Sequence, residues 1–123
     1  MEQTVALLAG LLTFAAPADT LDQYGWQARP ILVFAAEGDP RLDRQLSEFA
    51  SAADALRDRR NVVVVDTNAA STLRARFGPE GFTVILVGLD GGEKAREQGV
   101  VPGSVFNDAI DAMPMRRWKL DAD

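Results

Sequence analysis

The sequence predicts an α/β domain with elements in the order β-α-β-α-β-β-α, a four-stranded mixed sheet and helices on both faces. Three apolar runs, at residues 31–36, 62–65 and 82–87, have the length and composition of strands buried on both faces. An amphipathic segment joins the first two runs, so those strands should be parallel. Asp90-Gly91 follows the third run and is typical of a hairpin. The main alternative, five parallel strands alternating with helices, has no place for this hairpin.

The sequence indicates where the first helix begins and which of its sides is buried. Asp39 suits the N-cap position and Pro40 suits the first helical position. We expect this helix to run to about Arg59, where several arginines oppose the helix dipole favourably. Its apolar residues fall at helical spacing and form one stripe: Leu42, Leu46, Phe49, Ala53 and Leu56.

Two shorter helices and one edge strand complete the order. A helix is expected over residues 71–77, ended by Gly78-Pro79. Residues 93–98 are polar and charged, so they suit only an edge strand, where charge blocks unwanted pairing. The last helix should begin at Pro102 and end at Pro114, with these residues on its inner side: Val105, Phe106, Ala109, Ile110 and Met113.

Residues 1–18 differ in composition from the rest of the chain. An apolar run from Val5 to Ala16 precedes Ala16-Pro17-Ala18, which has the A-x-A form of a signal-peptide cleavage site. The sequence therefore predicts an exported protein, periplasmic or secreted. The first four residues contain Glu2 and no Lys or Arg, which leaves open an uncleaved N-terminal helix and a cytoplasmic location. Residues 19–29 then lead into a domain at 30–114, and 115–123 form a polar tail.

The composition excludes several kinds of active site. The 123 residues include 13 Lys and Arg, 18 Asp and Glu, no Cys and no His, with a formal net charge of −5. The chain therefore has no thiolate nucleophile, thiol redox couple, imidazole base or Cys/His zinc site. Its acidic balance argues against nucleic-acid binding. No apolar run reaches the roughly 18–20 residues of a stable membrane span. We expect no cofactor.

Five segments carry a resemblance to a known family. They are RPILVFA at 29–35, Asp39-Pro40, DRRNVVVVD at 58–66, FTVILVGLDGGEK at 82–94 and IDAMPMR at 110–116. In these segments the chain resembles a bacterial family of unknown function with a peroxiredoxin-related, thioredoxin-like fold. Related domains occur in vertebrate secreted proteins that contain sushi repeats. The resemblance implies a thioredoxin-like fold and, usually, export. It implies no established activity and so no catalytic residues.

Thioredoxin-like enzymes rely on two features that this sequence lacks. They place a redox Cys after the first strand, at the N-terminus of the next helix, where the helix dipole lowers the pKa of the thiol. That position here is residues 38–42, which contain no Cys, Ser or Thr. These enzymes also usually have a cis-proline before the third strand that helps to dock the substrate. That position falls near Phe82 or Thr83, and neither is proline. Thiol redox catalysis is excluded.

Three acidic residues follow the first two strands. Glu37 and Asp39 come after the first strand and Asp66 closes the second. The ends of adjacent parallel strands share one edge of the sheet, where open α/β sheets tend to bind ligands. With Phe82 and Thr83, these residues form a candidate binding edge. Three carboxylates could hold Ca²⁺ or Mg²⁺. Their spacing matches no known metal motif, however, and one cap plus two solvated acids is the simpler interpretation, so we predict no metal site.

The C-terminal tail provides a second candidate contact. Arg116, Arg117 and Lys119 could bind an anionic partner, with Trp118 as an anchor. Acidic residues follow at 121 and 123, so a solvated tail is the alternative.

Two functional hypotheses fit these observations. The first is a non-catalytic, thioredoxin-like binding module that contacts an unknown protein or envelope component. The second is an enzyme that uses carboxylates, and a metal if one is bound, at Glu37, Asp39 and Asp66. The second requires those groups to lie within ~4–6 Å of one another, with the pKa of at least one perturbed. The sequence identifies neither the partner nor the oligomeric state.

Overall fold

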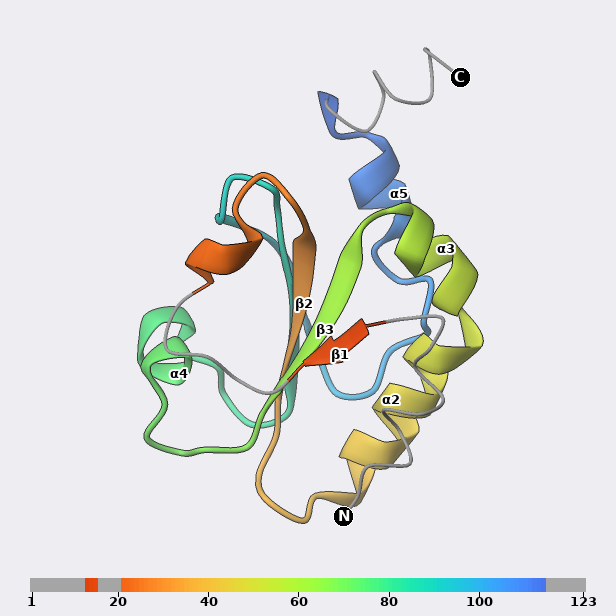
Figure 1. Cartoon of the computed structure of the whole chain (residues 1–123). Helices are drawn as coiled ribbons and strands as arrows, with labels where there is room; N and C mark the ends of the chain where they lie inside the picture. Colours follow the sequence, from red (N-terminus) through yellow and green to blue (C-terminus); the bar gives the residue numbers. More distant parts are fainter. Residues whose placement is uncertain (1–12, 16–20, 115–123) are drawn as a thin grey trace.

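The computed structural model describes residues 13–15 and 21–114, which form a five-stranded sheet with helices on both faces (Figure 1). The strand order is β1-β3-β2-β4-β5. β2 is parallel to β3 and antiparallel to β4, and β4 is antiparallel to β5. The mixed sheet and its hairpin are therefore as predicted, and the four predicted strands are displaced by no more than two residues. The strands are β1 (Thr13–Ala15), β2 (Arg29–Phe34), β3 (Asn61–Asp66), β4 (Thr83–Val87) and β5 (Glu93–Gln98).

β1 is the strand that the sequence did not predict. Thr13–Ala15 pairs in parallel with Val62, Val63 and Val64 of β3. The apolar composition of residues 1–18 suggests a signal peptide or a helix, but these three residues are extended. β3 would otherwise be an edge strand with unpaired backbone groups. Residues 1–12 and 16–18 lie outside the described residues.

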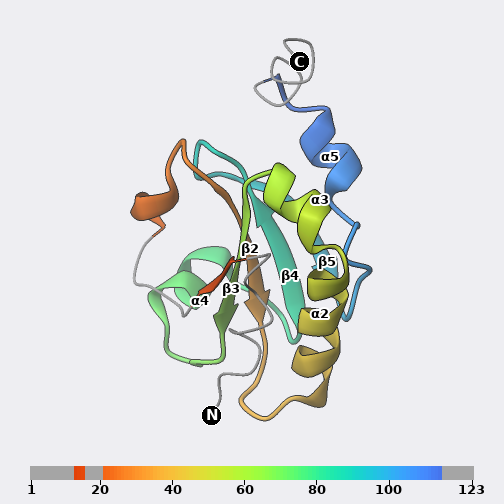
Figure 2. The same ribbon diagram turned by 45° about the vertical axis from the view of Figure 1, so that its right-hand side comes forward.

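The sheet separates two apolar layers. Ile31 and Val33 of β2 face one layer, which also holds Phe49, Leu56 and Ile110. Leu32 and Phe34, the alternate residues of β2, face the other layer with Leu73 and Phe77. This alternation follows from the two-residue period of a strand. Figures 1 and 2 accordingly show α4 on one side of the sheet and α2 with α3 on the other.

The first predicted helix is divided into two. α2 (Pro40–Ser51) ends before Ala52, and α3 (Ala53–Asp58) begins after it. The predicted apolar stripe faces the core across both pieces. The division coincides with a close approach of the chain at Gly103, where an added Cβ would lie 2.2 Å from the Glu48 carbonyl oxygen. This approach comes from a segment distant in sequence.

The other helices agree with the prediction to different degrees. α4 (Thr72–Phe77) is as expected, with Ser71 as its N-cap and Gly78 at its left-handed C-terminus with a φ of 57°. α5 (Asn107–Asp111) is much shorter than the predicted helix from Pro102 to Pro114. Residues 102–106 form turns instead, because the Val101 backbone is bound by the buried side chain of Gln45 and Gly103 packs on α2. A short 3₁₀ turn, η2 (Asp22–Tyr24), lies in the lead-in segment.

In the part of the chain that the structure describes, no helix has the length and apolar character that a membrane span requires.

Candidate functional site

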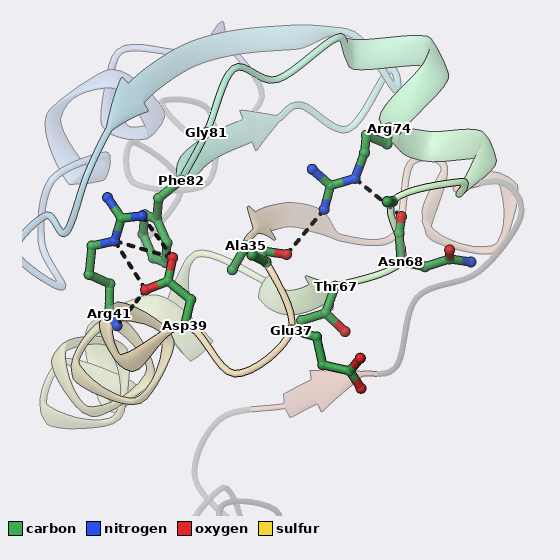
Figure 3. Close-up of a pocket in the computed structure, with 11 residues that line it drawn as sticks. Ala35, Glu37, Asp39, Arg41, Thr67, Asn68, Arg74, Gly81 and Phe82 are labelled. Atoms are coloured by element: carbon green, nitrogen blue, oxygen red, sulfur yellow. Dashed lines mark hydrogen bonds and ion pairs between the residues drawn. The ribbon is translucent and has the colours of Figure 1, made fainter.

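An open pocket of about 650 Å³ lies at the predicted binding edge of the sheet (Figure 3). The segments that follow β2 and β3, the start of α2, α4 and the residues before β4 all contribute to it. Glu37, Asp39 and Phe82 of the predicted edge line the pocket, whereas Asp66 and Thr83 do not. The full lining is Ala35, Ala36, Glu37, Asp39, Arg41, Thr67, Asn68, Ala69, Arg74, Gly81 and Phe82.

Asp39 and Arg41 form a tight ion pair at the N-terminus of α2. The Asp39 carboxylate accepts hydrogen bonds from the Arg41 backbone N–H at 2.9 Å and from Arg41 Nη2 at 2.8 Å. The side-chain bond, followed by the backbone bond, holds the pKa of Asp39 below its ordinary value. The same pair raises the pKa of Arg41. Asp39 is the N-cap of α2, as predicted, and it is an ionised partner of Arg41 rather than a general acid.

The Arg41 guanidinium also lies over the Phe82 ring, 5.1 Å from its centroid. This contact joins the start of α2 to the residue before β4. By the resemblance drawn from the sequence, these two positions correspond to those of the redox Cys and the cis-proline in thioredoxin-like enzymes. Here they hold a paired arginine and an aromatic ring, and the described residues contain no cis peptide bond. Around this contact the pocket lining contains no thiol or imidazole.

Asp66 is a structural residue of the loop between β3 and α4. Its side chain is buried, with 1% of the residue exposed. One carboxylate oxygen accepts from the Asn68 backbone N–H at 2.9 Å, and the other accepts from the Ser71 hydroxyl at 2.5 Å. Ser71 in turn caps α4 by accepting from the Arg74 backbone N–H. The carboxylate therefore shapes the loop and does not face the pocket.

The three predicted carboxylates do not converge. Asp39 is bound to Arg41 and Asp66 to Ser71, while Glu37 is exposed and points away from Asp39 in Figure 3. Across residues 13–15 and 21–114, no three Asp, Glu, His or Cys side chains are placed to hold a metal ion. Thr83 is buried, and its hydroxyl accepts from Gln98 Nε2 of β5 at 3.0 Å. The carboxylate-enzyme hypothesis thus lacks the assembled site that it requires.

Arg74, like Arg41, lines the pocket but is not among the residues that the sequence predicts for the binding edge. Its Nη2 donates to the backbone oxygens of Ala35 at 3.2 Å and Asp66 at 3.1 Å, and its Nε donates to that of Asn68 at 3.1 Å. Its guanidinium lies 5.4 Å from the centroid of the Phe34 ring. The residue therefore ties the ends of β2 and β3 to α4. In the sequence it is one of several arginines near a short helix, and only the tertiary fold distinguishes it.

The tail candidate, Arg116, Arg117, Trp118 and Lys119, lies outside the described residues.

Solved structures with the same fold are numerous and distant in sequence. An uncharacterised thioredoxin-like protein from Clostridium perfringens superposes with a TM-score of 0.67 at 9% identity, over 93% of this chain and 91% of that one. A mutant thioredoxin from Halobacterium salinarum gives a TM-score of 0.63 at 16% identity, over 81% and 88%. A thioredoxin from Malassezia sympodialis gives 0.58 at 17%, over 80% and 87%. At these identities the likeness shows a thioredoxin-like fold and nothing further.

Comparison with curated proteins gives no match. A family model, described as a domain of unknown function (DUF4174), matches residues 20–119. This range contains β2 to β5, α2 to α5 and the whole lining of the pocket. The chain therefore belongs to the DUF4174 family of domains and has a thioredoxin-like fold.

Proposed function

We propose that this domain is a non-catalytic binding module that contacts a protein or envelope component through the pocket beside Arg41 and Phe82. The observation that carries the proposal is the Asp39–Arg41 pair over the Phe82 ring. By the resemblance drawn from the sequence, the pair lies where thioredoxin-like enzymes carry the redox centre, and it offers charge and hydrogen bonds in place of a nucleophile.

The properties of the pocket suit binding. A volume of about 650 Å³ falls in the range of ligand sites, which combine apolar walls with a few fixed polar groups. Ala36 and Ala69 supply exposed apolar surface beside the buried Ala35 and Phe82. The two guanidinium groups are held by their own hydrogen bonds, so little conformational entropy is lost when a partner binds.

Affinity capture from the envelope fraction of the native host tests this proposal. The full chain is the bait, beside an Arg41→Glu variant that places a carboxylate opposite Asp39. Arg57→Glu on α3, outside the pocket, is the matched control for charge reversal. We expect a partner that is captured by the parent chain and by Arg57→Glu and is lost with Arg41→Glu. Equal capture by all three would contradict a role for the pocket.

The same capture includes an Arg116→Ala/Arg117→Ala variant. Loss of the partner in this variant alone would assign binding to the basic tail that the sequence predicts, with Trp118 as its anchor, instead of the pocket. Circular dichroism melting curves of every variant establish that a loss of capture is not a loss of fold.

We also propose that the protein is exported. The support is the apolar run that ends in Ala16-Pro17-Ala18. The pairing of Thr13–Ala15 with β3 is the opposing observation, because cleavage after Ala18 would remove β1 and leave β3 as an edge strand. The intact mass of the protein purified from the native host decides between them. A mass equal to that of a chain beginning at Asp19 supports export by cleavage. A mass that corresponds to a chain with residues 1–18 favours the cytoplasmic alternative.

A further inference from the structure

Arg74 is a fixed cation without a fixed counter-ion. Two of its three guanidinium nitrogens, Nε and Nη2, donate to three backbone oxygens. These bonds and the Phe34 ring determine the orientation of the guanidinium plane. No carboxylate in the described ranges forms an ion pair with Arg74, in contrast to Arg41 in the same pocket. Arg74 binds the backbone oxygen of Asp66, whose carboxylate is bound by Asn68 and Ser71 instead of by the guanidinium.

The remaining nitrogen of Arg74 faces the pocket. In Figure 3, Nη1 points away from the bonded carbonyls and towards the side of the pocket formed by Gly81 and Phe82. It can donate two N–H groups to a molecule in the pocket. A guanidinium held in this way binds an oxygen anion with little loss of its own freedom.

The charge of the lining selects the kind of anion. Two arginines and two carboxylates line the pocket, so its net formal charge is zero. Asp39 and Arg41 neutralise each other, which leaves Arg74 to attract an anion and Glu37, at the exposed rim, to repel it. A singly charged carboxylate matches one guanidinium better than a doubly charged phosphate does, and the chain as a whole carries −5.

We infer that the pocket binds an acidic side chain of a partner peptide, with the Asp or Glu carboxylate on Arg74 Nη1 and a neighbouring apolar side chain against the exposed Ala36 and Ala69 of the lining. This inference rests on the proposed binding function and names the chemistry that the partner presents. Glu37 weakens the contact and so sets a limit on how many acidic residues the bound segment contains.

Nuclear magnetic resonance titration of the isotope-labelled full chain tests the inference. The probes are the blocked tripeptide acetyl-Gly-Glu-Leu-amide, its Gln counterpart and inorganic phosphate. We expect saturable shifts of the Asn68, Gly81 and Phe82 amides and of the Arg74 Nε–H with the Glu peptide. The Gln peptide should bind at least about tenfold more weakly, the effect of losing one charge-assisted hydrogen bond.

Four variants test whether the carboxylate of the Glu peptide binds at Arg74. Arg74→Met should abolish the preference for Glu over Gln. Because Arg74 also ties three backbone carbonyls together, Arg74→Lys is the second variant; it keeps the charge and should reduce the preference without abolishing it. Glu37→Gln should tighten binding several-fold, since it removes the repelling charge. Arg57→Met, which removes an exposed guanidinium outside the pocket, should change nothing.

The outcomes separate this inference from the proposed function. Equal binding of the Glu and Gln peptides overturns the carboxylate contact and leaves a binding pocket. Tighter binding of phosphate overturns it in favour of a phosphorylated partner. No saturable shift up to about 10 mM overturns it as well. The proposed function fails separately, if Arg41→Glu does not change capture of the natural partner.

Discussion

Buried polar side chains fix the loops of this domain. Gln45 is the clearest example, because none of its surface is exposed and its amide pairs with both backbone groups of Val101. The Nε2–O and N–Oε1 distances are 2.9 and 2.8 Å. One side chain of α2 thus replaces a strand partner for the segment that follows β5.

Replacement of Gln45 by Leu should destabilise the domain by about 2–6 kcal/mol. The substitution keeps the side-chain volume roughly constant but leaves the N–H and C=O of Val101 buried without partners, at about 1–3 kcal/mol for each group. Urea unfolding followed by circular dichroism measures the difference. Ser47→Ala, on the exposed side of the same helix, is the control and should fall within about 0.5 kcal/mol of the parent. A cost for Gln45→Leu as small as that of the control would contradict this assignment.

At the scale of elements, the sequence predicts strands better than helix boundaries. Runs such as 62–65 are apolar without interruption. A short run of this kind is typical of a strand that is covered on both faces. The break at Ala52 and the short α5 depend instead on a contact between Gly103 and α2, which no local pattern contains. The extended conformation of Thr13–Ala15 likewise depends on the open edge of β3.

The candidate site shows the same difference between features that local sequence determines and features that distant contacts determine. Asp39 could be predicted because a helix cap is a local feature, and the sheet edge could be predicted because topology determines it. The burial of Asp66 and the position of Arg74 could not, since both depend on how the loop after β3 folds against the ends of two strands.

Gly103→Ala tests the contact that divides α2 from α3. An added Cβ would lie 2.2 Å from the Glu48 carbonyl oxygen and 2.9 Å from the Ala52 Cβ, so backbone must move. We expect a loss of about 1–3 kcal/mol in the free energy of unfolding, the usual cost of overpacking. Gly25→Ala is the matched control, because its nearest neighbour would lie 3.4 Å away. A Gly103→Ala variant as stable as Gly25→Ala would show that the contact is not tight.

At the scale of the whole molecule, the charge distribution determines the response to pH. The chain has no histidine, the side chain that ordinarily titrates between pH 5 and 7. The hydrogen bond with Arg41 lowers the pKa of Asp39, and the hydrogen bond with Arg96 lowers that of Glu93. A carboxyl whose pKa is lower in the folded state stabilises the protein above its unfolded pKa, and this contribution is lost as the pH falls through the folded value.

The melting temperature should therefore be nearly constant from about pH 5 to 7 and should fall between about pH 4 and 2. Because both pairs are at the surface, about 1 M NaCl should reduce the size of the fall. Differential scanning calorimetry at low and high salt measures both effects. A transition centred between pH 5 and 7, or an acid loss that salt leaves unchanged, would contradict the assignment to these pairs.

The central claim is that the pocket between Arg41, Phe82 and Arg74 is where this domain meets its partner. Site-specific photo-crosslinking in cells of the native host tests it most directly. A photoreactive residue replaces Glu37 at the exposed rim of the pocket or, as the control, Asp54 on the exposed side of α3. The account predicts a discrete cross-linked product from position 37 that is absent from position 54 and is lost when Arg41→Glu is added. The same products from both positions, or a product from position 54 alone, would contradict it.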